Sequence, residues 1–307
     1  MTLTLFFEQL LNGIQFGMML FLMSAGLTLV FGVMGLINLA HGVLYMVGAF
    51  ACALVAGITG SFWLGLVASL IVAAMAGALI EVGVIRRLYK RDHLDQVLAT
   101  YALILIFSEA TRWLFGSFPL YLDVPDILAQ PISLFGLLDY SSYRLFIIFV
   151  GIIVAIGLYL LITKTRLGMR IRAGESDREM IAALGVDIRT LYTLVFALGA
   201  ALAGIAGALL GAVQSVEVGM GGPVLILAFV VIVIGGIGSI KGAFIGALLV
   251  GVVDTMGRFL LPYLMTFLFS PETAANVGGA LSSIAIYILM AGILIVKPKG
   301  LIKGAGS

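Results

Sequence analysis

Four ionisable side chains stand inside otherwise apolar stretches of the sequence and are the first candidates for chemistry. They are Glu81, Glu109, Asp254 and Arg258. A charge within a lipid-embedded segment is costly, so such a residue either pairs with an opposite charge or serves a function. Asp254 and Arg258 are four residues apart, and Glu109 and Arg112 are three apart, so each pair shares a helix face. Both pairs are therefore predicted to form internal salt bridges. Glu109 and Asp254 are also candidates for lining a polar path, and Glu81, beside the basic segment at 86–91, is interpreted as interfacial.

Uncharged polar residues in the same apolar stretches extend this set of candidates. Gln15, Thr28, Asn38 and His41 are each placed where they could face a path. The alternative for Thr28 is a hydrogen bond to its own helix backbone. Asn38 and His41 fall at a glycine-rich break, where His41 either bonds a broken helix end or faces the path. No metal site is predicted, because His41 lacks partners and the single cysteine, Cys52, excludes a cysteine cluster.

The elements that must hold these residues follow from composition. Of 307 residues, 62% are hydrophobic and 10% are charged, whereas soluble domains are roughly 45–50% apolar and about 25% charged. Lipid is the solvent that suits such a chain, and the long continuous apolar runs indicate helices. The sequence therefore predicts an all-α, polytopic transmembrane bundle that forms one domain over residues 1–307. A net charge of +2 does not suggest a nucleic-acid partner.

Nine apolar segments are candidate spans, of which 222–236 is short and is interpreted alternatively as re-entrant or broken. Most of the 17 basic residues fall in regions that nine spans place on one side, which predicts a cytoplasmic C-terminus and an external N-terminus. The segments are 9–33, 39–58, 62–85, 95–115, 144–163, 190–213, 222–236, 242–262 and 277–296.

The sequence around 32–38 has a faint echo at 235–241, since both stretches are rich in glycine with the same spacing. A parallel internal repeat and chance similarity both explain this.

The basic segment 164–189 contains the pattern of a short helix with defined ends. Ser176 and Glu179 fit a capping box, in which Ser176 caps the helix and Glu179 reaches back. Gly185 supplies a stop. A short helix with an apolar face and a charged rim suits a groove on a soluble partner. The alternative is a surface helix that only connects two spans.

Three stretches carry a resemblance to a known family. Residues 174–186 resemble the coupling-helix segment of bacterial ATP-binding-cassette (ABC) importer permeases. Residues 26–42, which read GLTLVFGVMGLINLAHG, look like the first signature of branched-chain amino-acid importer permeases. Residues 233–243, VIGGIGSIKGA, look like the later glycine signature of these permeases. The resemblance extends over nearly the whole chain.

The resemblance implies an ABC importer permease fold of about eight or nine spans with a coupling helix at about 176–185. On that helix the residues that would meet the ATPase are Ser176, Glu179, Ala182, Ala183 and Gly185. The implied partners are a second permease, expected to be a different chain, two ATP-binding subunits and an external substrate-binding protein. ATP and Mg²⁺ would be bound by those subunits and no cofactor by this chain, which lacks a phosphate-binding loop and is not expected to be an enzyme.

The resemblance also implies a substrate and a location, and it leaves alternatives. The chain would translocate branched-chain or related small amino acids across the bacterial inner membrane. Permeases of the same family for urea, amides or aromatic acids remain alternatives. An ion-coupled secondary carrier is a further alternative, in which Glu109 and Asp254 would be the coupling acids.

Overall fold

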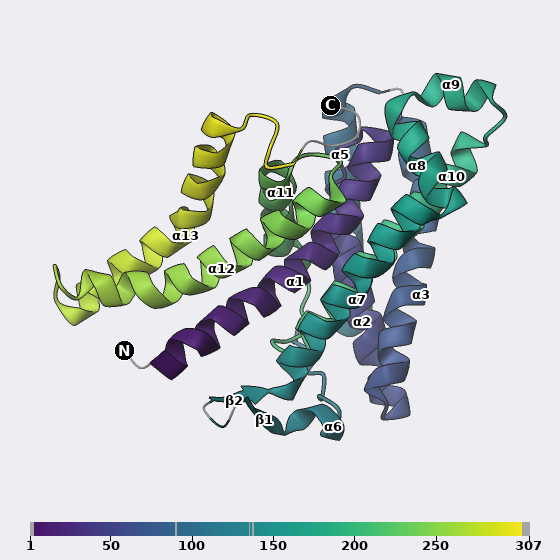
Figure 1. Cartoon of the computed structure of the whole chain (residues 1–307). Coiled ribbons are helices and arrows are strands. Elements are labelled where there is room, and N and C mark those ends of the chain that lie inside the picture. The colour runs from purple at the N-terminus through teal and green to yellow at the C-terminus, as the bar shows by residue number, and fades with distance from the viewer. Residues whose placement is uncertain (1–2, 90, 135, 137, 303–307) are drawn as a thin grey trace.

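The computed structural model is a bundle of helices (Figure 1) and describes residues 3–89, 91–134, 136 and 138–302, without the side chains of Arg178 and Glu179. In chain order the elements are α1 (Leu3–Met34), α2 (His41–Thr59), α3 (Phe62–Ile80), a π-helical turn (Glu81–Ile85), α4 (Arg86–Leu88), α5 (His93–Phe115), α6 (Asp126–Ala129), β1 (Pro131–Leu134), β2 (Leu138–Ser141), α7 (Ser142–Lys164), α8 (Arg166–Ser176), α9 (Arg178–Ala183), α10 (Ile188–Gly211), α11 (Gly221–Gly235), α12 (Ile240–Met265) and α13 (Pro271–Val296). Strands β1 and β2 form one antiparallel hairpin, in which Pro131 lies opposite Ser141.

Eight of the described helices are long and apolar enough to cross a membrane, counting α3 to α4 as one. They correspond to eight of the nine predicted segments. The ninth, 222–236, is the 15-residue helix α11, which is shorter than the roughly 20 residues that a span requires. The predicted polytopic helical fold is therefore confirmed, with eight long spans and one short helix.

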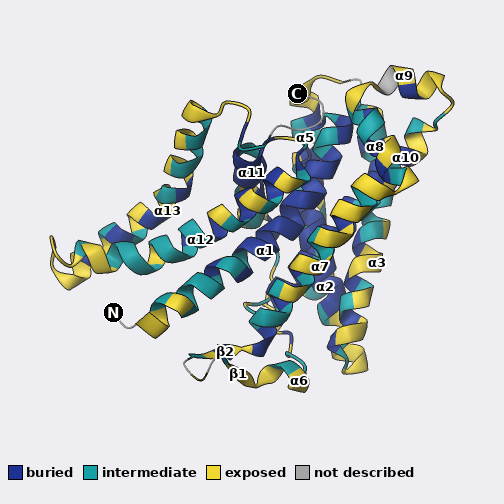
Figure 2. Ribbon diagram, in the orientation of Figure 1, coloured by how far each residue is buried: buried dark blue, intermediate teal, exposed yellow. Residues whose placement is uncertain are grey.

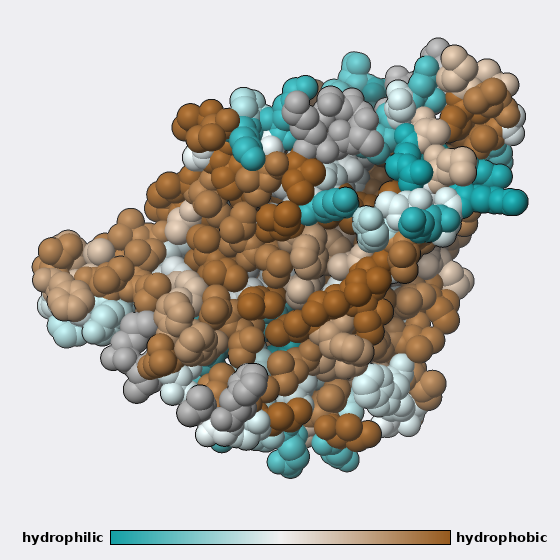
Figure 3. Space-filling model, viewed as in Figure 1, coloured by the Kyte–Doolittle hydropathy of each residue, from teal (hydrophilic) through white to brown (hydrophobic). Residues whose placement is uncertain are grey.

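The helices form an inner and an outer layer (Figure 2). The most apolar stretches of α1 and α10 are 83% and 78% buried, whereas those of α5, α7 and α13 are at most 17% buried. Helix α1 packs on α12 and α10, and α10 packs in turn on α2 and α3. The outer helices remain hydrophobic where they are exposed, as expected for a surface that faces lipid. Figure 3 shows this hydrophobic surface, with hydrophilic residues concentrated toward its two ends.

The two ends of the bundle carry different structures (Figure 1). Helices α8 and α9 and the C-terminal segment lie at one end, called here the basic end, whereas α6, β1 and β2 lie at the other, the hairpin end. The C-terminal segment is fixed at the basic end, because the amides of Leu301 and Ile302 donate to the carbonyls of Ile234 and Gly235 at 2.9 and 3.0 Å. The described basic residues of segments 86–91 and 164–189, together with Lys241, Lys297 and Lys299, lie at this end, in agreement with the prediction that most basic residues share one side.

Helices α2 and α11 both begin inside the bundle rather than at its ends. The first residue of α2, His41, donates from Nε2 to the carbonyl of Met23 at 3.2 Å, which is about 16 Å along α1 from its end at Met34. Gly221, the first residue of α11, meets Gly42 backbone to backbone, and a methyl group on Gly221 would overlap the Gly42 carbonyl. Two helix N-termini therefore meet deep in the bundle, and only glycine permits that approach.

The two glycine-rich stretches that echo one another each end a helix and share one glycine conformation. Gly35 and Gly238 occupy equivalent places in the two stretches and have φ angles of 63° and 80°, a region that favours glycine. The turns also lie against one another, because a methyl group on Gly32 would stand 3.2 Å from the Cα of Gly238. The two stretches share this glycine conformation but differ around it, because α1 continues to Met34 whereas α11 ends at Gly235, the equivalent of Gly32.

Candidate functional site

At the basic end, α9 is a short helix held away from the bundle by α8 and the segment before α10 (Figure 1). Its first turn is capped by Asp177, whose Oδ1 accepts from the amide of Met180 at 2.9 Å. The predicted cap, Ser176, is wrong, because this residue is the last of α8. The side chain of Glu179, the other half of the predicted capping box, lies outside the described residues.

The other end of α9 closes on Gly185, as predicted. The amide of Gly185 donates to the carbonyl of Ala182 at 3.0 Å, and the amide of Val186 donates to that of Ile181 at 3.3 Å. With φ of 84° at Gly185, this is a Schellman arrangement, which satisfies carbonyls that a helix end leaves free.

The side chains of α9 divide into an anchor and an exposed ridge. Ile181 is 6% exposed, whereas Met180 and Leu184 are 59% and 74% exposed. Ala182 and Ala183, both predicted to meet a partner, are exposed too. The arrangement presents small and apolar side chains on a helix that is capped at both ends, which is the form of a docking element.

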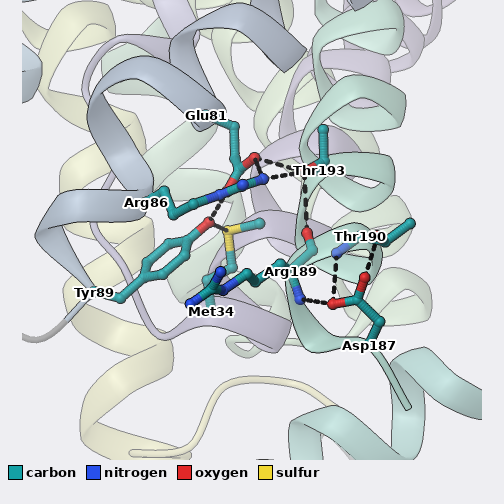
Figure 4. Close-up of polar contacts among 8 residues, drawn as sticks. All are labelled: Met34, Glu81, Arg86, Tyr89, Asp187, Arg189, Thr190 and Thr193. Carbon is teal, nitrogen blue, oxygen red and sulfur yellow. Dashed lines mark hydrogen bonds and ion pairs between the residues drawn. The ribbon is translucent and has the colours of Figure 1, made fainter.

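Helix α9 is followed along the chain by α10, whose start is held by a cap and by the bundle core. Asp187 caps α10 (Figure 4), because its Oδ1 accepts from the amides of Arg189 and Thr190 at 3.0 and 3.4 Å. Its Oδ2 accepts from the Thr190 hydroxyl at 2.5 Å. These hydrogen bonds, led by the one from the Thr190 hydroxyl, hold the pKa of Asp187 below its usual value. One carboxylate thus fixes the first turn of the helix that follows α9.

A buried carboxylate then ties α10 to the end of α3 (Figure 4). Glu81 has no exposed surface and accepts from Arg86 Nε and Nη2 at 3.2 and 2.9 Å. The hydroxyls of Tyr89 and Thr193 each donate to it at 2.6 Å. Tyr89 also packs edge-on against Tyr192, with ring centroids 5.0 Å apart.

The sequence places Glu81 near the interface beside Arg86, and the structure adds that it is the centre of a fully hydrogen-bonded cluster. The signal that was available is the spacing of Glu81, Arg86 and Tyr89 on one helical stretch. Thr193, which lies on another helix, had no such signal. Since each lone pair of the carboxylate finds a donor, the cluster fastens the start of α10 rather than leaving a reactive group.

The predicted path residues near the glycine-rich break are buried against α1. Thr28, Asn38 and His41 are at most 1% exposed. The Thr28 hydroxyl, both amide atoms of Asn38 and His41 Nδ1 have no hydrogen-bond partner among the described residues. Through its other ring nitrogen His41 bonds the carbonyl of Met23, which lies within the continuous helix α1 and not at the broken helix end that the sequence suggested.

The remaining predicted path residues are not brought together with this group. Asp254 pairs with Arg258 at 3.0 Å, and Glu109 pairs with Arg112 at 2.6 Å, as predicted. The Glu109 side chain is 67% exposed, so it lies on the outer surface of α5 rather than between helices of this chain. No group of three or more His, Cys, Asp or Glu in the described part of the chain is placed to hold a metal ion.

Gln15, the last of the predicted path residues, belongs to a polar cavity at the hairpin end. The cavity has a volume of about 730 Å³ and is bounded by α1, β2, α7, the end of α10 and α12. Gln15 is 5% exposed and donates from Nε2 to Met19 Sδ at 2.7 Å. The lining also includes the charged residues Glu8, Asp139 and Arg144, which sequence reasoning missed because they come from three separate elements.

An apolar bundle with eight helices long enough to span a bilayer among the described residues, an exposed short helix at one end and a polar cavity at the other is the form of a multi-pass membrane protein. Residues 9–295 match the family described as branched-chain amino acid transport system / permease component. The chain belongs to this family, which confirms the family expected from the sequence.

Relatives with established names agree with this assignment. The high-affinity branched-chain amino acid transport system permease protein BraD of Pseudomonas aeruginosa is 32% identical over 82% of this chain and 86% of its own. The probable branched-chain amino acid transport permease protein LivH of Methanocaldococcus jannaschii is 30% identical over 96% and 92%. LivH of Escherichia coli K12 is 27% identical over 94% and 95%. No solved structure matches the chain significantly.

Proposed function

We propose that this chain is a permease subunit of an ABC importer that carries branched-chain amino acids inward across the bacterial inner membrane. The observation that carries the proposal is family membership over residues 9–295, with relatives named for this transport that span nearly the same length. The partners are two ATP-binding subunits, a second permease and an external substrate-binding protein. ATP and Mg²⁺ are bound by the ATP-binding subunits.

In this proposal the basic end faces the cytoplasm and the hairpin end faces outward. The distribution of charge supports that orientation, because basic residues favour the cytoplasmic side and the regions around Arg86, Arg170 and Lys241 all lie at the basic end. The C-terminus is then cytoplasmic. Helix α9 is the coupling helix, and closure of the ATP-binding subunits acts on it.

The contacts of α9 support a path for that motion. The helix is anchored by Ile181 and passes through the Asp187 cap into α10, and α10 is fastened to α3 by Glu81 and Thr193. Because α10 lies in the inner layer, a displacement of α9 moves helices that line the interior. The exposed Met180 and Leu184 supply the apolar ridge that a groove on an ATPase would receive.

The acids inside the spans give no support to an ion-coupled carrier. Glu81, Glu109 and Asp254 each form a salt bridge with an arginine at 2.6 to 3.0 Å. A coupling acid must bind and release its ion, and a permanent arginine partner opposes this.

The experiment that tests the proposal is leucine uptake into proteoliposomes containing this chain with its partner subunits, with ATP inside or outside. Uptake that requires ATP on the basic side and the ATP-binding subunits supports the proposal. Uptake by the chain alone without ATP, or none of any branched-chain amino acid by the complete assembly, would overturn it.

The variant Ala183→Arg tests the role of α9 separately. A bulky charge on the exposed face of α9 is expected to abolish co-purification of the ATP-binding subunits while leaving insertion into the membrane intact. Met169→Arg is the matched control, because Met169 is 60% exposed at the same end but on α8. Equal co-purification of both variants with wild-type yield would contradict the coupling role of α9.

A further inference from the structure

We infer that the polar cavity at the hairpin end is a binding subsite for a free zwitterionic amino acid, which Arg144 holds by its carboxylate and Glu8 and Asp139 hold by its ammonium group. The inference rests on the proposed function and deepens it by naming where on the permease the substrate is first held and by which groups. The cavity volume of about 730 Å³ falls within the range of roughly 300–1,000 Å³ typical of small-molecule sites.

The first support is the balance of charge around the cavity. Glu8 comes from α1, Asp139 from β2 and Arg144 from α7. Both signs of charge therefore face one space from three elements. A ligand with one carboxylate and one ammonium group complements such a lining, whereas a simple anion or cation would meet a repelling charge.

The second support is that these charges leave one another unpaired. Within the described residues, none of Glu8, Asp139 and Arg144 takes part in a salt bridge, since the three that occur there involve other residues. Arg144 donates from Nη1 to the neutral Asn12 Oδ1 instead. A guanidinium has five donors, so the group is oriented by Asn12 and keeps donors for a carboxylate.

The third support is that two of these charges, Arg144 and Glu8, lie near the same buried tyrosine, Tyr140. Tyr140 donates to Asn12 Oδ1 at 3.1 Å, so Arg144 and Tyr140 share one acceptor. Burial raises the pKa of Tyr140 to about 12, and the charges of both Arg144 and Glu8 also act on it, in opposite directions. Arg144 and Glu8 therefore both lie near the Tyr140 hydroxyl, although they form no salt bridge with each other.

The cavity also provides a surface for an aliphatic side chain. Phe16, Leu210 and Val213 line it beside the polar groups. Gln15, almost completely buried, also lines it. An amino acid held by both ends of its backbone would rest its side chain on this apolar patch, which accommodates leucine, isoleucine and valine.

The test measures binding of radiolabelled leucine to the complete transporter in detergent without the external binding protein. Unlabelled leucine, leucinol (which lacks the carboxylate) and 4-methylpentanoate (which lacks the ammonium group) serve as competitors. In the wild type, each analogue is expected to compete at least tenfold less well than leucine.

The variants assign each half of the ligand to its partner. Arg144→Gln is expected to weaken leucine binding at least tenfold, so that leucine no longer binds more tightly than leucinol. Leucine is still expected to bind more tightly than 4-methylpentanoate. The double variant Glu8→Gln with Asp139→Asn is expected to bind leucine no more tightly than 4-methylpentanoate, while leucine still binds more tightly than leucinol. Arg144→Lys, which keeps the charge, is expected to recover part of the binding and so separates loss of charge from misfolding.

Arg112→Gln removes an exposed arginine outside this cavity and is expected to change neither binding nor selectivity. Unchanged leucine binding and unchanged analogue ratios in Arg144→Gln, in an assembly that still imports leucine, would overturn the subsite and leave the proposed function intact. An assembly that imports no branched-chain amino acid would instead reject the proposed function.

Discussion

The Glu81 cluster at the basic end and the charged cavity at the hairpin end use the same kinds of residue in opposite ways. Glu81 is fully buried, and donors from Arg86, Tyr89 and Thr193 occupy its carboxylate. Glu8, Asp139 and Arg144 face a shared cavity and form no salt bridge among the described residues. A charged side chain whose partners all come from the protein holds helices together, whereas a charged side chain without an ionic partner is available to bind a ligand. The comparison assigns fastening to one end and recognition to the other.

The largest change in stability is expected when the Glu81 cluster is removed. Glu81→Ala removes the acceptor from Arg86, Tyr89 and Thr193 in a buried setting and is expected to lower the free energy of unfolding by about 3 kcal/mol. Denaturant-induced unfolding of the purified chain in detergent measures the change. A loss below about 0.5 kcal/mol would show that the cluster does not fasten α10 to α3.

A smaller loss of stability is expected when only one hydrogen-bond donor of the cluster, the Tyr89 hydroxyl, is removed. Tyr89→Phe keeps the edge-on contact with Tyr192 but removes the 2.6 Å hydrogen bond to Glu81. Loss of a hydrogen bond to a charged group is expected to cost about 1.5 kcal/mol, measured in the same unfolding experiment. If Tyr89→Phe is as stable as the wild type, the carboxylate does not depend on this hydroxyl.

Glu175 differs from Glu81, because it is a partly buried acid at the basic end that forms no salt bridge among the described residues. It lies on α8 with its Oε1 close to Gly32 and Gly238, and burial raises the pKa of its carboxyl above the ordinary 4.5. The native state therefore holds a proton that the unfolded state releases, so stability falls as pH rises from 4.5 through the raised pKa.

Glu175→Gln is accordingly expected to raise the thermal midpoint at pH 8 and to raise it less at pH 5. Thermal unfolding at the two pH values measures this difference. An equal change at both, or a lower midpoint at pH 8, would mean that the charged carboxyl is stabilised in the fold.

The smallest expected effect lies on the recognition side. Glu8→Gln removes a charge that has no ionic partner among the described residues, so the free energy of unfolding is expected to stay within about 0.5 kcal/mol of the wild type. A loss near that of Glu81→Ala would erase the distinction between the two ends.

The sequence predicted those features that depend on neighbours along the chain. Long apolar runs predicted the spans, and the short run at 222–236 predicted that α11 would differ, because a hydrocarbon core requires a minimum length. The spacing of Asp254 and Arg258 predicted their pairing, since both lie on one helix face. Gly185 predicted a helix end because the residue there adopts positive φ.

The sequence did not predict where some helices begin and end, or which residues from separate elements pack together. Ser176 had the residue type of a cap, but α8 continues through it, so the next residue, Asp177, became the cap. The apolar run that begins at 39 indicated a span, but not that α2 begins deep in the bundle against Met23. The hairpin-end cavity escaped prediction except for Gln15, because Glu8, Asp139 and Arg144 meet only through the packing of α1, β2 and α7.

The central claim is that coupling resides at the basic end and substrate recognition at the hairpin end. The most direct measurement is leucine uptake and ATP hydrolysis, recorded together in proteoliposomes that contain the complete transporter. Ala183→Arg is predicted to lose the ATP-binding subunits and with them both activities. Arg144→Gln is predicted to retain the subunits and ATP hydrolysis but to lose most leucine uptake. If the two variants fail in the same way, or if Arg144→Gln transports leucine normally, the assignment of different tasks to the two ends is wrong.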